Sequence, residues 1–358
     1  MKKTFMVITA AMLLAGSSAF AEKTTLIDFT QLTADLDVTD ANGVTQPVNR
    51  RTVQDYAVAA GSSFTSTQKS LMRTSLSLPE WEVELNSSAR SVDALALSRT
   101  VAAPVSAESS QPFAGQSVLG VRVLFPAWAH NASARIVPPY EIQGYEPLTD
   151  ADDNGVRQAQ TDEQKGKYLY EDGYGLIRNV GTIKSISVTT FGDNFPHKLY
   201  VLLKDNDNTE RRYYMGTLQF DGWKTLIWNN PNYIEEVRAR EVRVYPIYPR
   251  GLPYIKFAGF EVTRDAADIG NNFVAYFKQV DVIYDKAILS ETRDIAEEDL
   301  WGVVTKEEAD RKYIEMSRFG NKQVDRYIER AKEATEDSFT HTDYLSPDAD
   351  SNAQQSQR

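Results

Sequence analysis

The feature of this sequence that most limits its fold is a two-residue alternation of apolar and polar side chains between about residues 24 and 286. In residues 81–85, Trp, Val and Leu alternate with two glutamates, which is the pattern of a strand with one buried face. Comparable strand patterns or apolar runs occur at 121–125, 186–189, 199–203, 242–244, 255–262 and 273–284. A chain with this period builds sheets rather than a helical bundle.

Turn-forming residues separate these strands, as in Asp205-Asn206-Asp207-Asn208 and Gly270-Asn271-Asn272. Many short strands without long intervening helices predict an antiparallel β-sandwich, jelly-roll-like, over residues 22–286. We expect surface-loop insertions at about 99–117 and 148–167, and a short helix near residues 67–72.

After residue 286 the period changes to that of a helix, and residues 287–340 form a charged helical segment in this prediction. Val324, Tyr327 and Ile328 share one helical face and are a candidate assembly or packing surface. Thr305 to Glu308 has the spacing of a capping box, and Gly320 is expected to break or kink the run. The polar residues 341–358 are expected to be disordered.

The N-terminus has the three parts of a secretory signal peptide. Lys2 and Lys3 precede an apolar stretch too short to span a bilayer, and Ala19-Phe20-Ala21 forms a cleavage site. We therefore expect residues 1–21 to be removed and the mature chain to begin at Glu22, in the periplasm.

Composition excludes several function classes. A net charge of −11 without a basic block makes nucleic acid and anionic membrane surfaces poor partners. The absence of cysteine excludes disulfides and thiolate chemistry, and three histidines leave little for imidazole chemistry. No nucleophile elbow, phosphate loop or dinucleotide loop is present, and no cofactor is expected.

Two acidic features are candidate sites, one for a metal ion and one for glycoside hydrolysis. Asp150, Asp152 and Asn154 have the first spacings of a calcium loop, but Thr161 stands where the closing Glu belongs, so an acidic loop is favoured. Carboxylates near aromatic residues could serve glycoside hydrolysis, but chance placement among 50 acidic residues is the favoured interpretation. The carboxylates considered are Asp193, Asp221, Glu235 and Glu236.

The aromatic residues Trp223, Trp228 and Tyr233 cluster in the sequence and are the candidate interface. If exposed on a sandwich face, they would stack on sugar rings or anchor a protein partner. Buried in the sheet, they would be core residues, which is the favoured interpretation for any one of them.

Longer stretches of the chain form an ordered series of distinctive segments between about residues 77 and 330. They are WEVELNSSAR (81–90), LGVRVLFP (119–126), GYGLIRNVGTIKSI (173–186), NFPHKL (194–199), MGTLQFDGW (215–223), WNNPNYI (228–234) and YFKQVDVIYDKA (276–287). This series resembles one family, the spirochaetal flagellar filament outer-layer (sheath) proteins.

This resemblance implies a non-enzymatic structural subunit that coats a flagellin core in the periplasm and contributes to filament stiffness, shape and motility. It also implies a sandwich similar to carbohydrate-binding modules and no catalytic residues. The implied partners are core flagellin subunits, other copies of this chain or other sheath proteins, and glycans on the core. The alternative is a periplasmic carbohydrate-binding module-like protein.

Overall fold

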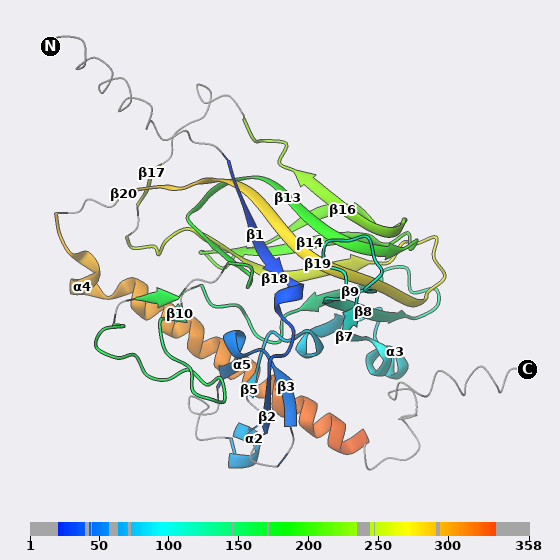
Figure 1. The fold of residues 1–358 in the computed structure, drawn as a ribbon, viewed down its shortest axis with the longest axis horizontal. Helices are drawn as coiled ribbons and strands as arrows, with labels where there is room; N and C mark the ends of the chain where they lie inside the picture. Colours follow the sequence, from blue (N-terminus) through cyan, green and yellow to red (C-terminus); the bar gives the residue numbers. More distant parts are fainter. Residues whose placement is uncertain are drawn as a thin grey trace, which may run out of the picture.

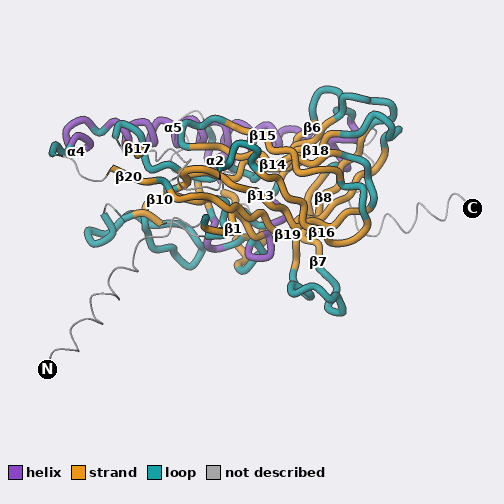
Figure 2. The backbone as a smooth tube through the Cα atoms, turned by 90° about the horizontal axis from the view of Figure 1, so that it is seen from above, coloured by secondary structure: helices purple, strands orange, loops and turns teal. Residues whose placement is uncertain are grey.

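The computed structural model describes residues 21–39, 43, 45–56, 64–70, 73–144, 146–165, 167–169, 172–234, 244–246, 248–290 and 294–333. Two six-stranded antiparallel sheets form a sandwich, and a long C-terminal helix lies along one side of it (Figure 1, Figure 2). The antiparallel β-sandwich predicted from the two-residue alternation is confirmed.

The first sheet has the order β16-β13-β19-β8-β7, and β1 pairs with β19 beside β8. Its strands are β16 (Asp221–Asn229), β13 (Val180–Asp193), β19 (Asn271–Lys286), β8 (Ser117–Phe125), β7 (Arg99–Pro104) and β1 (Glu22–Asp28).

The second sheet has the order β15-β14-β18-β9-β6, and β12 pairs with β18. Its strands are β15 (Glu210–Thr217), β14 (Lys198–Asp205), β18 (Tyr254–Thr263), β9 (Ser133–Val137), β6 (Glu82–Leu85) and β12 (Leu176–Arg178).

Short elements surround the sandwich. The strands are β2 (Leu36–Thr39), β3 (Thr45–Val48), β4 (Gln54–Asp55), β5 (Arg73–Thr74), β10 (Glu146–Pro147), β11 (Tyr168–Leu169), β17 (Val244–Pro246) and β20 (Ile288–Ser290). The helices are α2 (Ser66–Ser70), α3 (Val92–Leu97), α4 (Glu297–Trp301) and α5 (Val303–Glu333), with 3-10 turns at Phe29–Gln31, Arg50–Thr52 and Leu78–Glu80.

Aromatic side chains fill the space between the sheets. Phe260 of β18 stacks on Phe277 of β19 with ring centroids 4.2 Å apart, and both are fully buried. Gly259 permits this packing, because its φ is +136° and an added Cβ would lie 2.4 Å from the Ile136 carbonyl oxygen. The glycine accompanies a register shift between β14 and β18, as expected at a β-bulge.

The turn predicted at 205–208 joins β14 to β15. The Asp205 carboxylate accepts hydrogen bonds from the amides of Asp207 (3.1 Å) and Thr209 (2.9 Å), and Asn208 has a φ of +59°. This confirms the local interpretation of that acidic run as a turn.

Three boundaries differ from the sequence prediction. Residues 99–104 are not loop but strand β7, which pairs with β8, so the connection is confined to residues 105–116. Ile288–Ser290 is a strand parallel to β17, so the helical segment starts later than residue 287.

The third correction concerns α5, which runs from Val303 to Glu333 without a break at Gly320. Gly320 and its neighbour Phe319 are buried, so tertiary packing offsets the low helix propensity of glycine. The helix also does not begin at Thr305, where the sequence predicts a capping box. Glu298 of α4 accepts hydrogen bonds from the amides of Val304 and Thr305 at 3.1 and 2.9 Å, which starts the helix two residues earlier.

Within the residues that the structure describes, none of the helices combines the length and apolar composition needed to cross a membrane.

Candidate functional site

A row of aromatic rings crosses the outer face of the first sheet. Trp223 of β16 lies opposite Phe191 of β13, and Phe191 lies opposite Tyr276 of β19. The ring centroids are 5.5 Å apart for the first pair and 5.8 Å for the second, both edge-to-face. All three side chains are half-buried and stand outside the hydrophobic core between the sheets. The row therefore offers aromatic surface outward.

The connection between β7 and β8 supports this row. Its Phe113 is 6% exposed and meets Trp223 edge-on at 4.7 Å between centroids. Lys278 lies 5.9 Å from the Phe113 ring centroid and forms an ion pair with Asp28 at 2.9 Å. Figure 2 shows the connection standing out beside β7, on the side of the sandwich away from α5.

Two carboxylates continue the row toward the end of the sheet. Asp193 of β13 lies directly opposite Asp221 of β16, and both are exposed. Partial burial, followed by the negative charge of Asp221, raises the pKa of Asp193. Burial and the charge of Asp193 likewise raise the pKa of Tyr276, so the acidic pair and the aromatic row are electrostatically coupled.

The structure separates the three aromatic residues that were predicted together. Trp228 is opposite Ile186 of the core and faces inward, 4.8 Å from the Tyr213 ring of the second sheet. Trp223 is five residues away on the same strand and faces outward, because successive side chains alternate. Trp223 and Trp228 therefore lie on opposite faces of the sheet, and of the two only Trp223 belongs to the outer face.

Tyr233 lies beyond the end of β16. Its hydroxyl donates to Asp285 at 3.0 Å, and the Lys184 ammonium is 5.3 Å from its ring centroid. The predicted set thus leaves Trp223 on the outer face, while Phe113, Phe191 and Tyr276 were missed. Strand pairing brings the last two to Trp223, and that pairing is long-range in sequence.

α5 lies over part of the outer face of the second sheet, while Tyr214 of β15 on the same face is 46% exposed. Phe319 of the helix is 2% exposed, and its ring centroid lies 4.6 Å from that of Tyr56. Lys322 reaches β6, where it pairs with Glu82 and with Glu84 at 2.9 Å. Of the two outward glutamates of β6, Glu82 is therefore buried against the helix, and Glu84 stays exposed at the edge of the contact.

Glu141 is the centre of an ion network beneath α5. Its carboxylate pairs with Lys256, with Lys204 at 2.9 Å and with Arg318 of the helix at 4.0 Å. Burial alone would raise the pKa of Glu141, but the two ammonium groups hold it below its ordinary value. The Glu315 carboxylate of α5 accepts the Glu141 amide at 2.9 Å, so the helix is fixed at several points.

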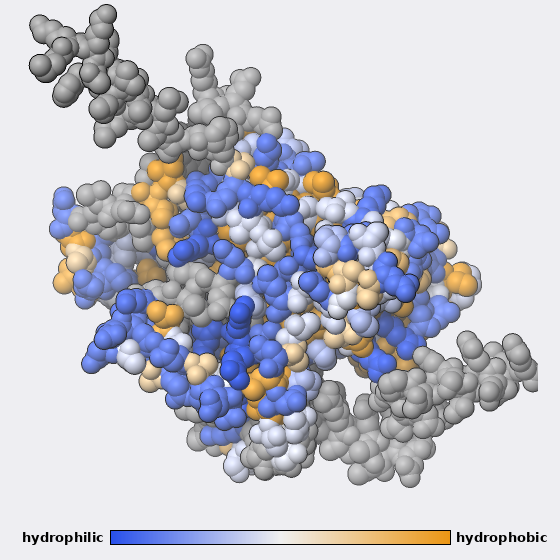
Figure 3. All heavy atoms as spheres, viewed as in Figure 1, coloured by the Kyte–Doolittle hydropathy of each residue, from blue (hydrophilic) through white to orange (hydrophobic). Residues whose placement is uncertain are grey.

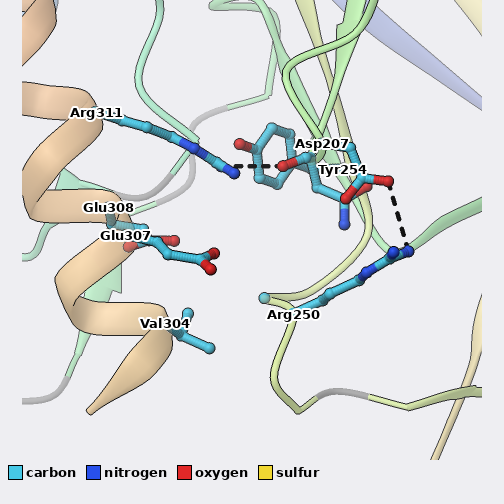
Figure 4. A pocket seen from close by; sticks show the side chains of 9 residues that line it. Asp207, Arg250, Tyr254, Val304, Glu307, Glu308 and Arg311 are labelled. Carbon is cyan, nitrogen blue, oxygen red and sulfur yellow. Dashed lines mark hydrogen bonds and ion pairs between the residues drawn. The ribbon is translucent and has the colours of Figure 1, made fainter.

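A small pocket of about 20 Å³ lies between the first half of α5 and the β14–β15 turn (Figure 4). Such a volume holds one or two water molecules. Arg311 donates to the Asn206 carbonyl at 2.9 Å, and Arg250 pairs with Asp207 at 3.5 Å. Burial raises the pKa of Glu308 in its wall to about 7, with Arg311 opposing and Glu298 and Glu307 adding to the shift.

Comparison with known proteins identifies the family. The family model for the flagellar filament outer layer protein FlaA matches residues 45–293. A flagellar filament outer layer protein of Treponema pallidum (strain Nichols) is 54% identical over 342 residues, which cover 95% of this chain and 97% of that protein. This chain belongs to the flagellar filament outer layer protein family.

Another family member, from Spirochaeta aurantia, is 40% identical and covers 95% of each chain. That of Borreliella burgdorferi is 34% identical over 70% of this chain and 67% of its own length. Likeness to solved structures is weak. A carbohydrate-binding module, TmCBM61 in complex with beta-1,4-galactotriose, is 12% identical with a TM-score of 0.26, covering 58% of this chain and 90% of that chain.

In this family member, the residues predicted as a helical assembly face fall on α5, but their side chains lie outside the described residues. They are Val324, Tyr327 and Ile328. Residues 1–20, and with them almost all of the expected leader, also lie outside the described residues, as do Glu235 and Glu236.

In the acidic loop, the Asp152 carboxylate forms hydrogen bonds within the loop itself. Asp152 accepts hydrogen bonds from the amides of Asn154 at 2.9 Å and Val156 at 2.8 Å, and from the Gln158 side chain. Among the described residues, no group of three or more His, Asp or Glu side chains is arranged to hold a metal ion. The arrangement of Asp150, Asp152 and Asn154 is that of a local turn.

Proposed function

We propose that this chain is a structural, non-catalytic subunit of the outer layer of the periplasmic flagellar filament, where it coats a core of flagellin subunits. Family membership over most of the chain carries this proposal.

Export through a cleaved leader is part of the proposal. The first strand, β1, begins at Glu22, the residue expected to follow the cleavage site, and its Glu22 carboxylate pairs with Lys286 of β19 at 2.7 Å. A strand that begins at this position is compatible with removal of residues 1–21.

We assign the filament contact to the outer face of the first sheet. α5 lies over part of the second sheet, whereas the first sheet presents a row of half-buried aromatic rings next to two opposed carboxylates. Half-exposed Trp and Tyr side chains are typical anchors of protein interfaces. The side of the molecule drawn in Figure 3 is mostly hydrophilic, with small separate apolar patches such as that over α4.

The test is to purify periplasmic filaments from the native cell and to measure by mass spectrometry whether this chain is stoichiometric in them, with Glu22 at its N-terminus. Presence in amounts comparable to the core subunits is the expected result. Absence from filaments, with abundance in the soluble periplasm, would overturn the proposal.

A co-sedimentation assay with stripped core filaments then tests the face. Trp223→Ala on the first sheet is expected to reduce co-sedimentation. Tyr214→Ala is the matched control, since Tyr214 is a 46% exposed aromatic residue on the second sheet. Equal co-sedimentation of both variants would remove the first sheet from the contact.

The second candidate is a periplasmic carbohydrate-binding protein. The aromatic row favours it, because half-exposed rings can stack on sugar rings. Binding of soluble glycans by the monomeric protein, together with its absence from filaments, would support this candidate. If the core filament itself carries glycans that the chain binds, both candidate functions would be correct.

A further inference from the structure

One end of the outer face of the first sheet carries both aromatic rings and carboxylates, and we call it the acidic–aromatic end. It comprises the rings of Trp223, Phe191 and Tyr276 and the carboxylates of Asp193 and Asp221. All five side chains are exposed or half-buried on the same face of three neighbouring strands.

The paired carboxylates destabilise the sheet. Like charges directly opposite each other on paired strands repel. Within the described part of the chain, Asp193 and Asp221 have no ion-pair or hydrogen-bond partner. Two acidic side chains elsewhere on this sheet are paired: Asp281 with Lys23 at 3.2 Å and Asp28 with Lys278 at 2.9 Å. A positive charge between Asp193 and Asp221 would relieve the repulsion.

The adjacent rings favour a cation as well, because the face of an aromatic ring attracts positive charge. The chain makes this interaction with its own side chains. The Lys224 ammonium lies 5.2 Å from the Phe220 ring centroid, and the Arg212 guanidinium lies 4.3 Å from that of Tyr200. At the acidic–aromatic end, rings and carboxylates are present, and none of the described lysine or arginine side chains pairs with the two carboxylates.

We propose that the acidic–aromatic end binds an arginine side chain of a basic segment of a protein partner. The planar guanidinium stacks on Trp223 and donates hydrogen bonds to Asp193 and Asp221, a geometry that an ammonium group does not match. A neutral sugar would stack equally well but would leave the carboxylates repelling each other. The inference deepens the proposed function: it rests on this face being the contact surface and specifies the chemistry of the partner.

The experiment is a titration of the purified full chain, labelled with 5-fluorotryptophan, with the peptide acetyl-Gly-Arg-Gly-Arg-Gly-amide. The chain has five tryptophans, and Trp223→Phe assigns the reporting ¹⁹F resonance. The same peptide with citrulline in place of arginine keeps the planar shape and removes the charge. A neutral β-glucan hexasaccharide is the sugar probe.

We expect the arginine peptide to shift the Trp223 resonance, and the citrulline peptide to bind at least tenfold more weakly. Asp193→Asn/Asp221→Asn should also weaken arginine binding at least tenfold. The control Asp153→Asn/Glu163→Gln changes the net charge equally at two exposed positions of the acidic loop and should stay within twofold.

No shift of Trp223 with the arginine peptide, equal binding of the citrulline peptide, or no loss in the Asp193/Asp221 variant would overturn the inference. A shift with the hexasaccharide that persists in that variant would identify a sugar-binding face instead. Loss of arginine binding with normal filament co-sedimentation would overturn this inference alone. Arginine binding by a chain that is absent from filaments would overturn the proposed function alone.

Discussion

The two outer faces of this sandwich are built from similar alternating strands, but they differ in whether their outward charges are paired within the described chain. On the second sheet, outward charges such as Glu82 and Lys256 are buried beneath α5, where each has an ion-pair partner. On the first sheet, the outward Asp193 and Asp221 face each other without a partner in the described chain. Among the described residues, these buried charges of the second sheet are thus paired within the chain, and the two carboxylates of the first sheet are not. The predictions that follow test this difference.

The largest effect is expected at the covered face. Phe319→Ala should lower the free energy of unfolding by about 4 kcal/mol, because the buried ring and its contact with Tyr56 are lost and a cavity is left in their place. Urea unfolding measures this change. Tyr313→Ala is the control, since Tyr313 lies on the same helix with 66% exposure and should change stability by less than about 0.5 kcal/mol. Equal effects would mean that α5 does not pack as described.

The ion network is the next test. Glu141→Ala should cost about 3 kcal/mol, because it leaves the buried Lys256 ammonium without its carboxylate. Asp162→Asn breaks an exposed pair with Lys165 and should cost less than about 1 kcal/mol. Thermal unfolding of both variants measures the difference, and a cost for Glu141→Ala as small as the control's would show that solvent reaches the network.

A pH-dependent effect is expected from Glu308. Burial raises its folded pKa to about 7 from an ordinary 4.5, so folding favours the protonated acid. Its contribution to stability is therefore greatest below pH 4.5 and is lost as the pH rises to 7. Glu308→Gln should be more stable than the native chain at pH 8 by on the order of 1 kcal/mol, discounted for partial solvent exposure.

At pH 5 the two proteins should be nearly equal in stability. Urea midpoints at both pH values give the comparison. A difference that stays constant between pH 5 and 8 would contradict a buried, protonated Glu308 in the wall of this pocket.

The smallest expected effect is a stabilisation, and it concerns the outer face of the first sheet. Asp193→Asn removes one of two opposed charges and should raise the free energy of unfolding by about 0.5 kcal/mol at low salt. The gain should shrink at high salt, because exposed charges are screened. A destabilised variant would mean that Asp193 has a structural partner, and the contrast between the two faces would fail.

The sequence was sufficient to predict the strands, the sandwich and the existence of a C-terminal helix, because apolar periodicity and turn residues are local signals. It did not reveal that α5 lies over part of the second sheet, because the alternating glutamates of β6 have the pattern of a solvent-exposed face, whereas Glu82 is buried. The continuous helix through Gly320 depends on burial of Phe319, which no local pattern encodes.

The candidate site was predicted only in part. Trp223 belongs to the outer face, but Trp228 faces the core, and the five-residue spacing on one strand was the available signal. Phe191 and Tyr276 are 32 and 53 residues from Trp223 along the chain, and only the strand register brings them to it.

The long pairing of β13 with β19 has a mechanical consequence. These strands have 14 and 16 residues and are paired from Val180 opposite Lys286 to Gly192 opposite Ala275. Hydrogen bonds between antiparallel strands lie perpendicular to them, so tension along the strands loads many bonds together in shear. A subunit aligned with this direction would deform little under a bending torque, and its compliance would reside in the joints between subunits.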